Sequence, residues 1–287
     1  SAVSRGLGDV YKRQFIFSSL NSDQLYKYSI FLFFISLISL FLVPFIGVEV
    51  KGSKRWIELF FLPRFQPIEV LKPFLIIILA TILCDIKSNI LFKYLISIFL
   101  ISVISLLLIA QPDIGQTLLV VFCWAVLIFT SGINIYILLA IFIAGASLLT
   151  YLIIYVPRFD YIQGRIFSFF NRETGTHNFQ SDKAIESITS GGFFGKGIGE
   201  GVLKNRVPEA HTDYIISVIS EEFGVVAIML ILLLFLILIY MVFKKISFET
   251  NDKVKLILIG SISLILMQAT IHAVSYTHLR AHETLHY

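Results

Sequence analysis

The stretch VVAIMLILLLFLILIYMVF occupies residues 225–243 and contains no charged side chain. A helix needs about 20 apolar residues to cross the roughly 30 Å hydrocarbon core of a bilayer, and a helix satisfies its own backbone hydrogen bonds there. The stretch therefore predicts a transmembrane helix. Six other apolar runs have a similar length: residues 28–47, 67–86, 91–110, 114–132, 135–156 and 254–273. We expect an all-α polytopic transmembrane helical bundle with seven spans.

The composition supports a membrane protein and excludes a soluble domain. The 287 residues are 57% hydrophobic and 14% aromatic, and the mean hydropathy is +0.86, which is far above the range of soluble domains. The net charge of +4 is modest, so we expect membrane lipid and no nucleic acid around the chain. Cys84 and Cys123 lie far apart in apolar runs, which favours packing roles over a disulfide.

The two ends of the sequence differ from its middle. Residues 1–14 (SAVSRGLGDVYKRQ) and 274–287 (VSYTHLRAHETLHY) resemble translated sequencing-adaptor sequence and are set aside as non-native. Three of the six histidines lie in the second of these stretches. We expect residues 15–273 to form one membrane domain and the native protein to be longer at both ends.

Lysines in the short loops predict the orientation. Cytoplasmic loops are enriched in Lys and Arg. Two short loops between apolar runs lie on the same side of the membrane by parity, together with Lys27. The lysines that flank these two loops are Lys87 and Lys93 for the first and Lys244, Lys245, Lys253 and Lys255 for the second. The loops 48–66 and 157–212 then face outward, the second being long. The first outward loop nevertheless carries Lys51, Lys54, Arg55 and Arg64. Either the charge bias is only statistical here, or these cations recognise an anionic ligand outside.

The only long polar insertion, residues 190–224, contains the strongest candidate for a catalytic group. Asp213 lies where the last part of the insertion begins to read as a helix, and a carboxylate in a first turn is favoured and ionised. Helical spacing puts Ser217, Ser220 and Glu221 near the same face. A simple helix cap is the alternative explanation of Asp213. His211 is expected to be a hydrogen-bonding neighbour, because no second histidine lies at metal-ligand spacing.

Other polar groups are candidates for substrate binding. Glu69 and Lys72 lie three residues apart in the second apolar run, so they share a helix face. They either neutralise each other at the interface or line an outward cavity. Lys196 and Lys204 add positive charge to the long outward loop. The alternating glycines 195, 197, 199 and 201 lack the context of a dinucleotide site; we expect them to allow backbone to approach a ligand or the membrane surface.

Five motifs in order resemble the SEDS family (shape, elongation, division and sporulation), and its division branch more than its elongation branch. They are GVEVKGSKRWI (47–57), QPxExxK (66–72), QPDxG (111–115), SGGFFGKG (190–197) and PEAHTDYI (208–215). The resemblance extends over residues 15–273. Family members have about ten spans, so it implies that three are absent from this chain.

The resemblance implies a peptidoglycan glycosyltransferase of the bacterial cytoplasmic (inner) membrane. Such an enzyme polymerises lipid II, an undecaprenyl-pyrophosphate-linked disaccharide pentapeptide, on the outer face of that membrane. It works with a class B penicillin-binding protein, which is a transpeptidase, and with other divisome proteins. The resemblance implies that Asp213 is the essential catalytic residue and that Glu69 and Lys72 line the same cavity.

The expected chemistry needs a base for a sugar hydroxyl and positive charge for a pyrophosphate leaving group. We expect Asp213 to be the base. Arg55, Lys72, Lys196 and Lys204 are the expected cations, with a divalent cation as a further possibility and no metal ligands identified. A lipid transporter or flippase would also use ionisable groups within a membrane. A scaffold that recruits a transpeptidase is the third alternative.

Overall fold

The computed structural model describes residues 22–50, 53–59, 62–85, 89–156, 189–197, 200 and 215–274. Within these residues it has seven long helices, each of which contains most of one predicted apolar run. They are α2 (Ser22–Ile46), α3 (Pro67–Leu83), α4 (Ile90–Ala110), α5 (Ile114–Thr130), α6 (Ile135–Tyr155), α9 (Ile215–Phe248) and α10 (Asp252–Val274). Five of them, all except α3 and α5, are long and apolar enough to cross a membrane. The predicted polytopic helical fold is confirmed.

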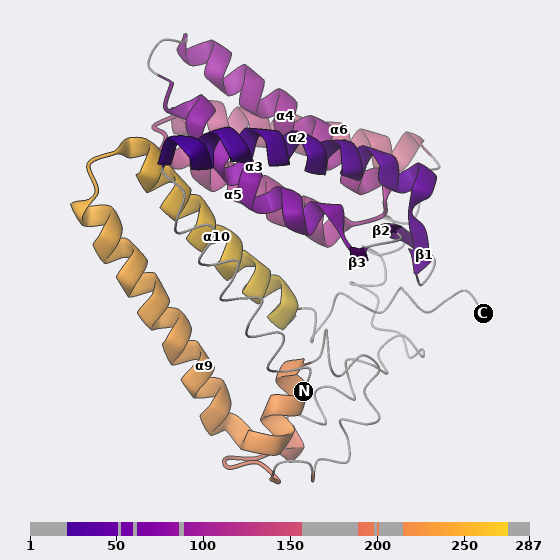
Figure 1. Ribbon diagram of the computed structural model, residues 1–287, viewed down its shortest axis with the longest axis vertical. Helices are drawn as coiled ribbons and strands as arrows, with labels where there is room; N and C mark the ends of the chain where they lie inside the picture. The colour runs from indigo at the N-terminus through magenta and orange to yellow at the C-terminus, as the bar shows by residue number, and fades with distance from the viewer. Residues whose placement is uncertain are drawn as a thin grey trace.

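The first predicted loop contains a small antiparallel sheet that the sequence analysis missed. Its strands β1 (Val48–Val50), β2 (Ser53–Leu59) and β3 (Leu62–Phe65) lie in the order β1-β2-β3. Glu49 is paired with Lys54, and Ile57 with Phe65. The strands are short and carry several cations, so their alternation of apolar and polar residues is weak. Only Gln66 separates β3 from α3, and the sheet therefore lies at the beginning of that helix (Figure 1).

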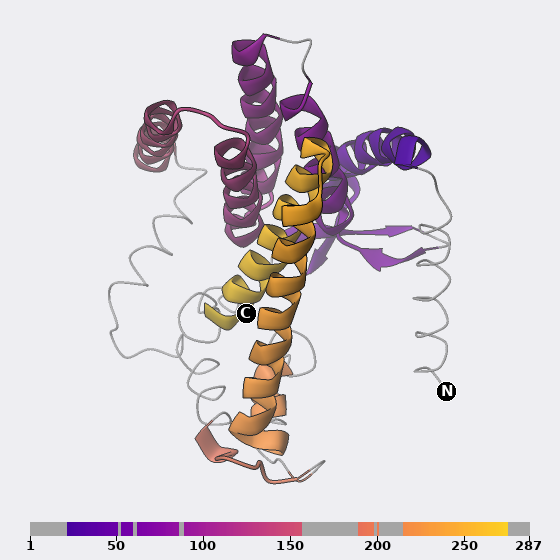
Figure 2. The same ribbon diagram turned by 90° about the vertical axis from the view of Figure 1, so that its left-hand side faces the viewer.

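Helix α3 lies at the centre of the bundle. It packs against α2, α4, α5 and α10, and in Figure 1 these helices gather around it, while α9 runs away from the group. Its side chains at 71, 75, 76, 79 and 80 are almost completely buried. Helix α6 contacts α5 at the edge of the bundle and stands apart from α3 (Figure 2). We call the end of the bundle that carries β1–β3 and the α4–α5 turn the hairpin end.

Helix α10 approaches α3 and α5 closely at Gly260. A Cβ atom at Gly260 would lie 2.7 Å from Ile76 Cγ2 and 3.0 Å from Leu127 Cδ2. The Cys123 Sγ lies 3.5 Å from the Gly260 carbonyl oxygen. A glycine at this position therefore sets the distance between α10 and the centre of the bundle.

We predict that Gly260→Val destabilises the protein by about 1–3 kcal/mol, because overpacking a close helix contact forces the neighbours apart. Gly145→Val is the matched control, since Gly145 also lies within a helix but a Cβ there meets nothing within 4 Å. Thermal unfolding in detergent should show a lower midpoint for Gly260→Val than for Gly145→Val. Equal midpoints would contradict the close packing of α10.

Candidate functional site

A buried lysine lies at the hairpin end of α3. Lys72 is only 2% exposed, and a buried ammonium is costly unless each N–H group has an acceptor. Its Nζ lies 2.7 Å from Glu69 Oε2, one turn earlier on the same helix. The Glu69 side chain is 41% exposed, so the pair connects the interior of the bundle with its surface. The predicted shared face is confirmed and the two charges neutralise each other, whereas the lining of a substrate cavity stays a prediction.

Two glutamines from other helices complete the surroundings of this ion pair. Gln116 on α5 accepts a hydrogen bond from Lys72 Nζ through Oε1 at 3.1 Å and donates through Nε2 to Glu69 Oε1 at 2.8 Å. Gln268 on α10 accepts from Lys72 Nζ through Oε1 at 3.3 Å. The ion pair therefore joins α3, α5 and α10. Neither glutamine was predicted from the sequence to be a site residue.

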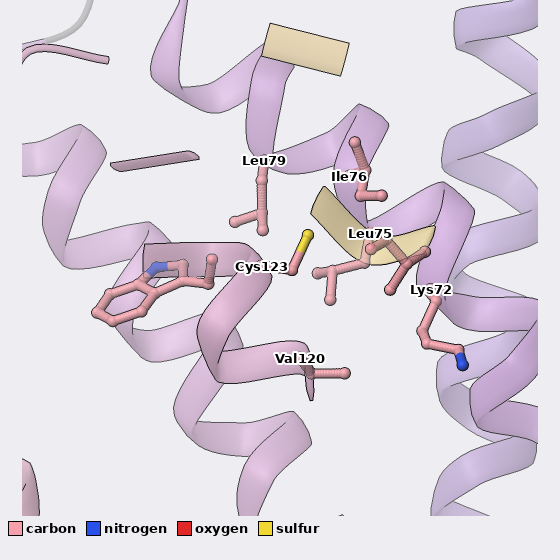
Figure 3. A pocket seen from close by; sticks show the side chains of 8 residues that line it. Lys72, Leu75, Ile76, Leu79, Val120 and Cys123 are labelled. Atoms are coloured by element: carbon pink, nitrogen blue, oxygen red, sulfur yellow. The ribbon is translucent and has the colours of Figure 1, made fainter. Parts of the chain in front are cut away.

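A small apolar cavity lies against the stem of Lys72. Its volume of about 10 Å³ is comparable to the space that one water molecule needs. Figure 3 shows that the Lys72 amino group points away from the side chains of Leu79 and Cys123. The lining residues are Lys72, Leu75, Ile76, Leu79, Val120, Cys123, Trp124 and Leu264. The polar chemistry therefore lies at the amino group, beyond this cavity.

Arg55 links the sheet to the turn between α4 and α5. Its Nη2 donates to the Pro112 carbonyl oxygen at 2.8 Å, and its Nε donates to the Gln111 carbonyl oxygen at 3.3 Å. Asp113 lies 4.0 Å from Arg55 Nε and caps α5, its Oδ1 accepting from the Gln116 backbone N–H. Arg55 has a structural role here, and its binding of substrate stays a prediction.

The glycine-rich segment packs against a kink in α9. Gly224 interrupts that helix with φ 73° and ψ −170°, a conformation that is accessible to glycine and strained for other residues. In a regular helix the N–H groups of Val225 and Val226 would bond to the carbonyls of Glu221 and Glu222. At a kink these four groups need other partners.

The loop supplies partners for all four groups. The N–H groups of Lys196 and Gly197 donate to the Glu221 and Glu222 carbonyls at 2.9 and 3.1 Å. The Gly192 and Phe193 carbonyls accept from the N–H groups of Val225 and Val226 at 3.0 and 3.3 Å. We call this arrangement, residues 191–197 on residues 221–226, the glycine clasp.

The glycines of the clasp permit this backbone contact. A Cβ at Gly191 would collide with the Ser220 carbonyl oxygen, and a Cβ at Gly195 with that of Glu222. Gly195 was predicted to allow close approach to a ligand or to the membrane surface, but the backbone that it and Gly191 approach is that of α9. Helical spacing was expected to place Ser220 and Glu221 near the same face as Asp213, beside the candidate site. Both are instead buried, at 1% and 0% exposure, because the clasp covers them.

Lys196 has an acidic partner in the clasp. Its Nζ lies 3.6 Å from Glu221 Oε1, and its side chain is 39% exposed. Asp213, Lys204 and His211 lie outside the described residues, so their predicted roles stay predictions. Asp213 precedes the first residue of α9 by two positions in the sequence.

These features define a class of protein: a multi-pass helical membrane protein with an ion pair set into one end of its bundle. A family model described as "Cell cycle protein", FTSW_RODA_SPOVE, matches residues 12–279. The chain belongs to this FtsW/RodA/SpoVE family, which confirms the resemblance found in the motifs.

Similar proteins agree with this assignment. The chain is 35% identical to the probable peptidoglycan glycosyltransferase FtsW of Tolumonas auensis over 69% of this chain and 52% of that protein. It is 32% identical to the protein of the same name from Haemophilus influenzae over 80% of this chain and 59% of that protein. The chain thus spans between half and three fifths of the length of these relatives.

Two solved structures share the fold. One, described as "Structural coordination of polymerization and crosslinking by a peptidoglycan synthase complex", superposes with a TM-score of 0.75 at 25% identity, over 96% of this chain and 77% of that one. The other is the rod shape determining protein RodA of Thermus thermophilus, with a TM-score of 0.63 at 26% identity, over 94% and 72% of the two chains.

We predict that removing Glu69 destabilises the protein more than removing Lys72. Glu69→Ala leaves an uncompensated ammonium in the interior and should cost about 3 kcal/mol. Lys72→Met leaves a carboxylate that water can reach and should cost about 1 kcal/mol. Thermal unfolding of both variants in detergent measures the difference, and a larger loss for Lys72→Met would contradict the burial described here.

We also predict that Gly224→Ala opens the glycine clasp, since the new Cβ would collide with the Phe193 carbonyl oxygen and φ is positive. Hydrogen exchange at the amides of Lys196 and Gly197 should become faster. Gly192→Ala is the control, because it also has a positive φ but nothing within 4 Å of the added Cβ. Faster exchange in both variants to the same extent would show that the close contact is unimportant.

Proposed function

We propose that this chain forms part of a peptidoglycan glycosyltransferase that polymerises lipid II into glycan strands during cell division. The observation that carries the proposal is the Glu69–Lys72 ion pair, held by two amides at the hairpin end of the bundle. Ionisable groups within a membrane bundle are costly and mark functional sites. The relatives are named as FtsW glycosyltransferases, which supports glycosyl transfer over other reactions at this site.

The reaction makes one glycosidic bond and breaks one bond to phosphate. The 4-hydroxyl oxygen of the acceptor sugar attacks the anomeric carbon of the donor, and its proton passes to the Asp213 carboxylate. The bond between that carbon and the phosphate oxygen breaks, and its electron pair leaves with undecaprenyl pyrophosphate. A positioned base contributes about 10²–10⁴-fold to such a step.

Cations stabilise the negative charge that develops on the pyrophosphate. Lys72 is the best candidate among the described residues, because its partner Glu69 is exposed and so brings the ion pair to the surface of the bundle. Arg55 and Lys196 each bond to another residue of the protein. In the proposal they therefore hold neighbouring segments in place and also contribute positive charge. Lys204 adds positive charge in the proposal, and His211 is a hydrogen-bonding neighbour of Asp213.

A divalent cation bound to the pyrophosphate would contribute in the same way. The part of the chain that the structure describes holds no group of three or more His, Cys, Asp or Glu side chains suited to a metal. In this proposal a metal therefore enters with the substrate phosphates, a mode that is common for Mg²⁺.

The proposal also includes an orientation and partners. The hairpin end faces the outside of the bacterial cytoplasmic membrane, which agrees with the lysines at the opposite ends of α9 and α10. A class B penicillin-binding protein crosslinks the new strands, and other divisome proteins recruit the pair. The description of the similar complex, which names both polymerisation and crosslinking, supports a transpeptidase partner.

The test is polymerisation of lipid II by the full-length protein in lipid vesicles. We predict long glycan products for the unmodified protein and at least a 100-fold lower rate for Asp213→Asn, as expected when a general base is removed. Asp252→Asn is the matched control, because Asp252 is an exposed carboxylate at the opposite end of the bundle, paired with Lys255.

Two results would contradict the proposal. Normal polymerisation by Asp213→Asn would remove Asp213 from the role of base. Movement of labelled lipid II across the vesicle membrane, without any increase in its mass, would favour the transporter.

A further inference from the structure

The Lys72 ammonium has three N–H groups and three acceptors, one from each of three helices. Glu69 Oε2 on α3 lies at 2.7 Å, Gln116 Oε1 on α5 at 3.1 Å and Gln268 Oε1 on α10 at 3.3 Å. An ammonium is donor-only and has no further capacity once three acceptors are present. Its direction is therefore determined by these three contacts together.

The two glutamines contribute differently. Gln116 bonds to both members of the ion pair, so it would stay beside Glu69 even if the ammonium moved. Among the hydrogen bonds of the described residues, Gln268 has one to the ammonium and none to Glu69, so it gives Lys72 an acceptor on the α10 side. Loss of the Gln268 acceptor would let the ammonium turn toward its two remaining partners.

Helix packing holds Gln268 in place. Gly260, Leu264 and Gln268 form an i, i+4 row along α10. Gly260 contacts α3 and α5 closely, and Leu264 lines the cavity beside Lys72. The row therefore presents the Gln268 side chain to Lys72 from a backbone that the bundle fixes.

The amide of Gln268 can have only one orientation in this contact. An ammonium cannot accept a hydrogen bond, so the carbonyl oxygen faces Lys72 and the NH₂ group faces away. This NH₂ group makes no hydrogen bond within the described residues, and the side chain is partly exposed. A donor is thus left beside the ammonium, where it suits an anionic oxygen.

We propose that Gln268 is a positioning residue: its carbonyl oxygen holds the Lys72 ammonium toward α10, and its NH₂ group donates to an anionic oxygen that the charge of Lys72 attracts. The ligand class is a phosphate or pyrophosphate ester. The positioning of Lys72 follows from the contacts alone, whereas the identity of the ligand rests on the proposed glycosyltransferase function. Gln268 acts through Lys72 and does not replace it.

The experiment compares two substitutions of nearly equal size in the full-length protein. Gln268→Met keeps the packing and removes the acceptor, whereas Gln268→Glu keeps an acceptor at the same reach and adds charge. If the acceptor matters, the melting temperature should fall more for Gln268→Met than for Gln268→Glu. If only packing matters, the order should be reversed, because a charge in a partly buried apolar position is costly.

Repeating the pair in a Lys72→Met background tests whether the effect passes through Lys72. Without the ammonium, Gln268→Glu should become the less stable variant. Thr270→Val is the control, since Thr270 Oγ1 bonds only within its own helix, to the Leu266 carbonyl at 2.8 Å. This control should give similar shifts in both backgrounds.

Lipid II polymerisation provides a second and separate readout. Gln268→Met should lower kcat/KM by about tenfold at equal amounts of folded protein, consistent with one misplaced charge contact, and Gln268→Glu should also lower it, because a carboxylate cannot donate to the anionic ligand. The positioning role would be overturned if Gln268→Met had a higher melting temperature than Gln268→Glu and if Lys72→Met left this order unchanged. If the melting temperatures followed the expected order but the unmodified protein did not polymerise lipid II, the positioning role would stand. Only the proposed glycosyltransferase function would be rejected.

Discussion

The arrangement of the hairpin end depends on one constraint, which is that a charged ammonium lies inside an apolar bundle. A buried cation without acceptors would cost several kcal/mol, so helices that surround Lys72 must bring oxygen atoms to it. Helix α3 provides Glu69, α5 provides Gln116 and α10 provides Gln268. The close contact at Gly260 and the central position of α3 are the packing that makes this convergence possible.

A second constraint acts at the beginning of α9, where a polar segment joins a membrane span. The backbone turns at Gly224, and the turn leaves four hydrogen-bonding groups without helical partners. The glycine clasp satisfies these groups with its own backbone and covers Glu221, whose carboxylate pairs with Lys196. The direction of residues 215–223 is therefore fixed by local hydrogen bonds. In the proposed function this rigidity serves Asp213, which lies two positions before that segment in the sequence.

Much of this architecture could be predicted from the sequence, because long apolar runs allow few structures in a membrane. The pairing of Glu69 with Lys72 also followed from their spacing on one helix. The acceptor role of Gln268 could not be predicted, since a single amide in an apolar run does not reveal a partner 196 positions away. The only available signal was that a polar side chain within a span tends to bond to another helix. Gly195 and Gly197 were recognised as sites of close approach, but their partner was the kink in α9, which no local pattern showed.

The central claim is that Asp213 and the Glu69–Lys72 pair belong to one site at the hairpin end. The most direct measurement is thiol crosslinking in the full-length protein, with cysteines at positions 69 and 213 and with Cys84 and Cys123 replaced. A short bifunctional reagent should join the two positions as efficiently as it joins a reference pair at 69 and 116, whose side chains are in contact. Efficient crosslinking of the reference pair without any product between 69 and 213 would contradict the account.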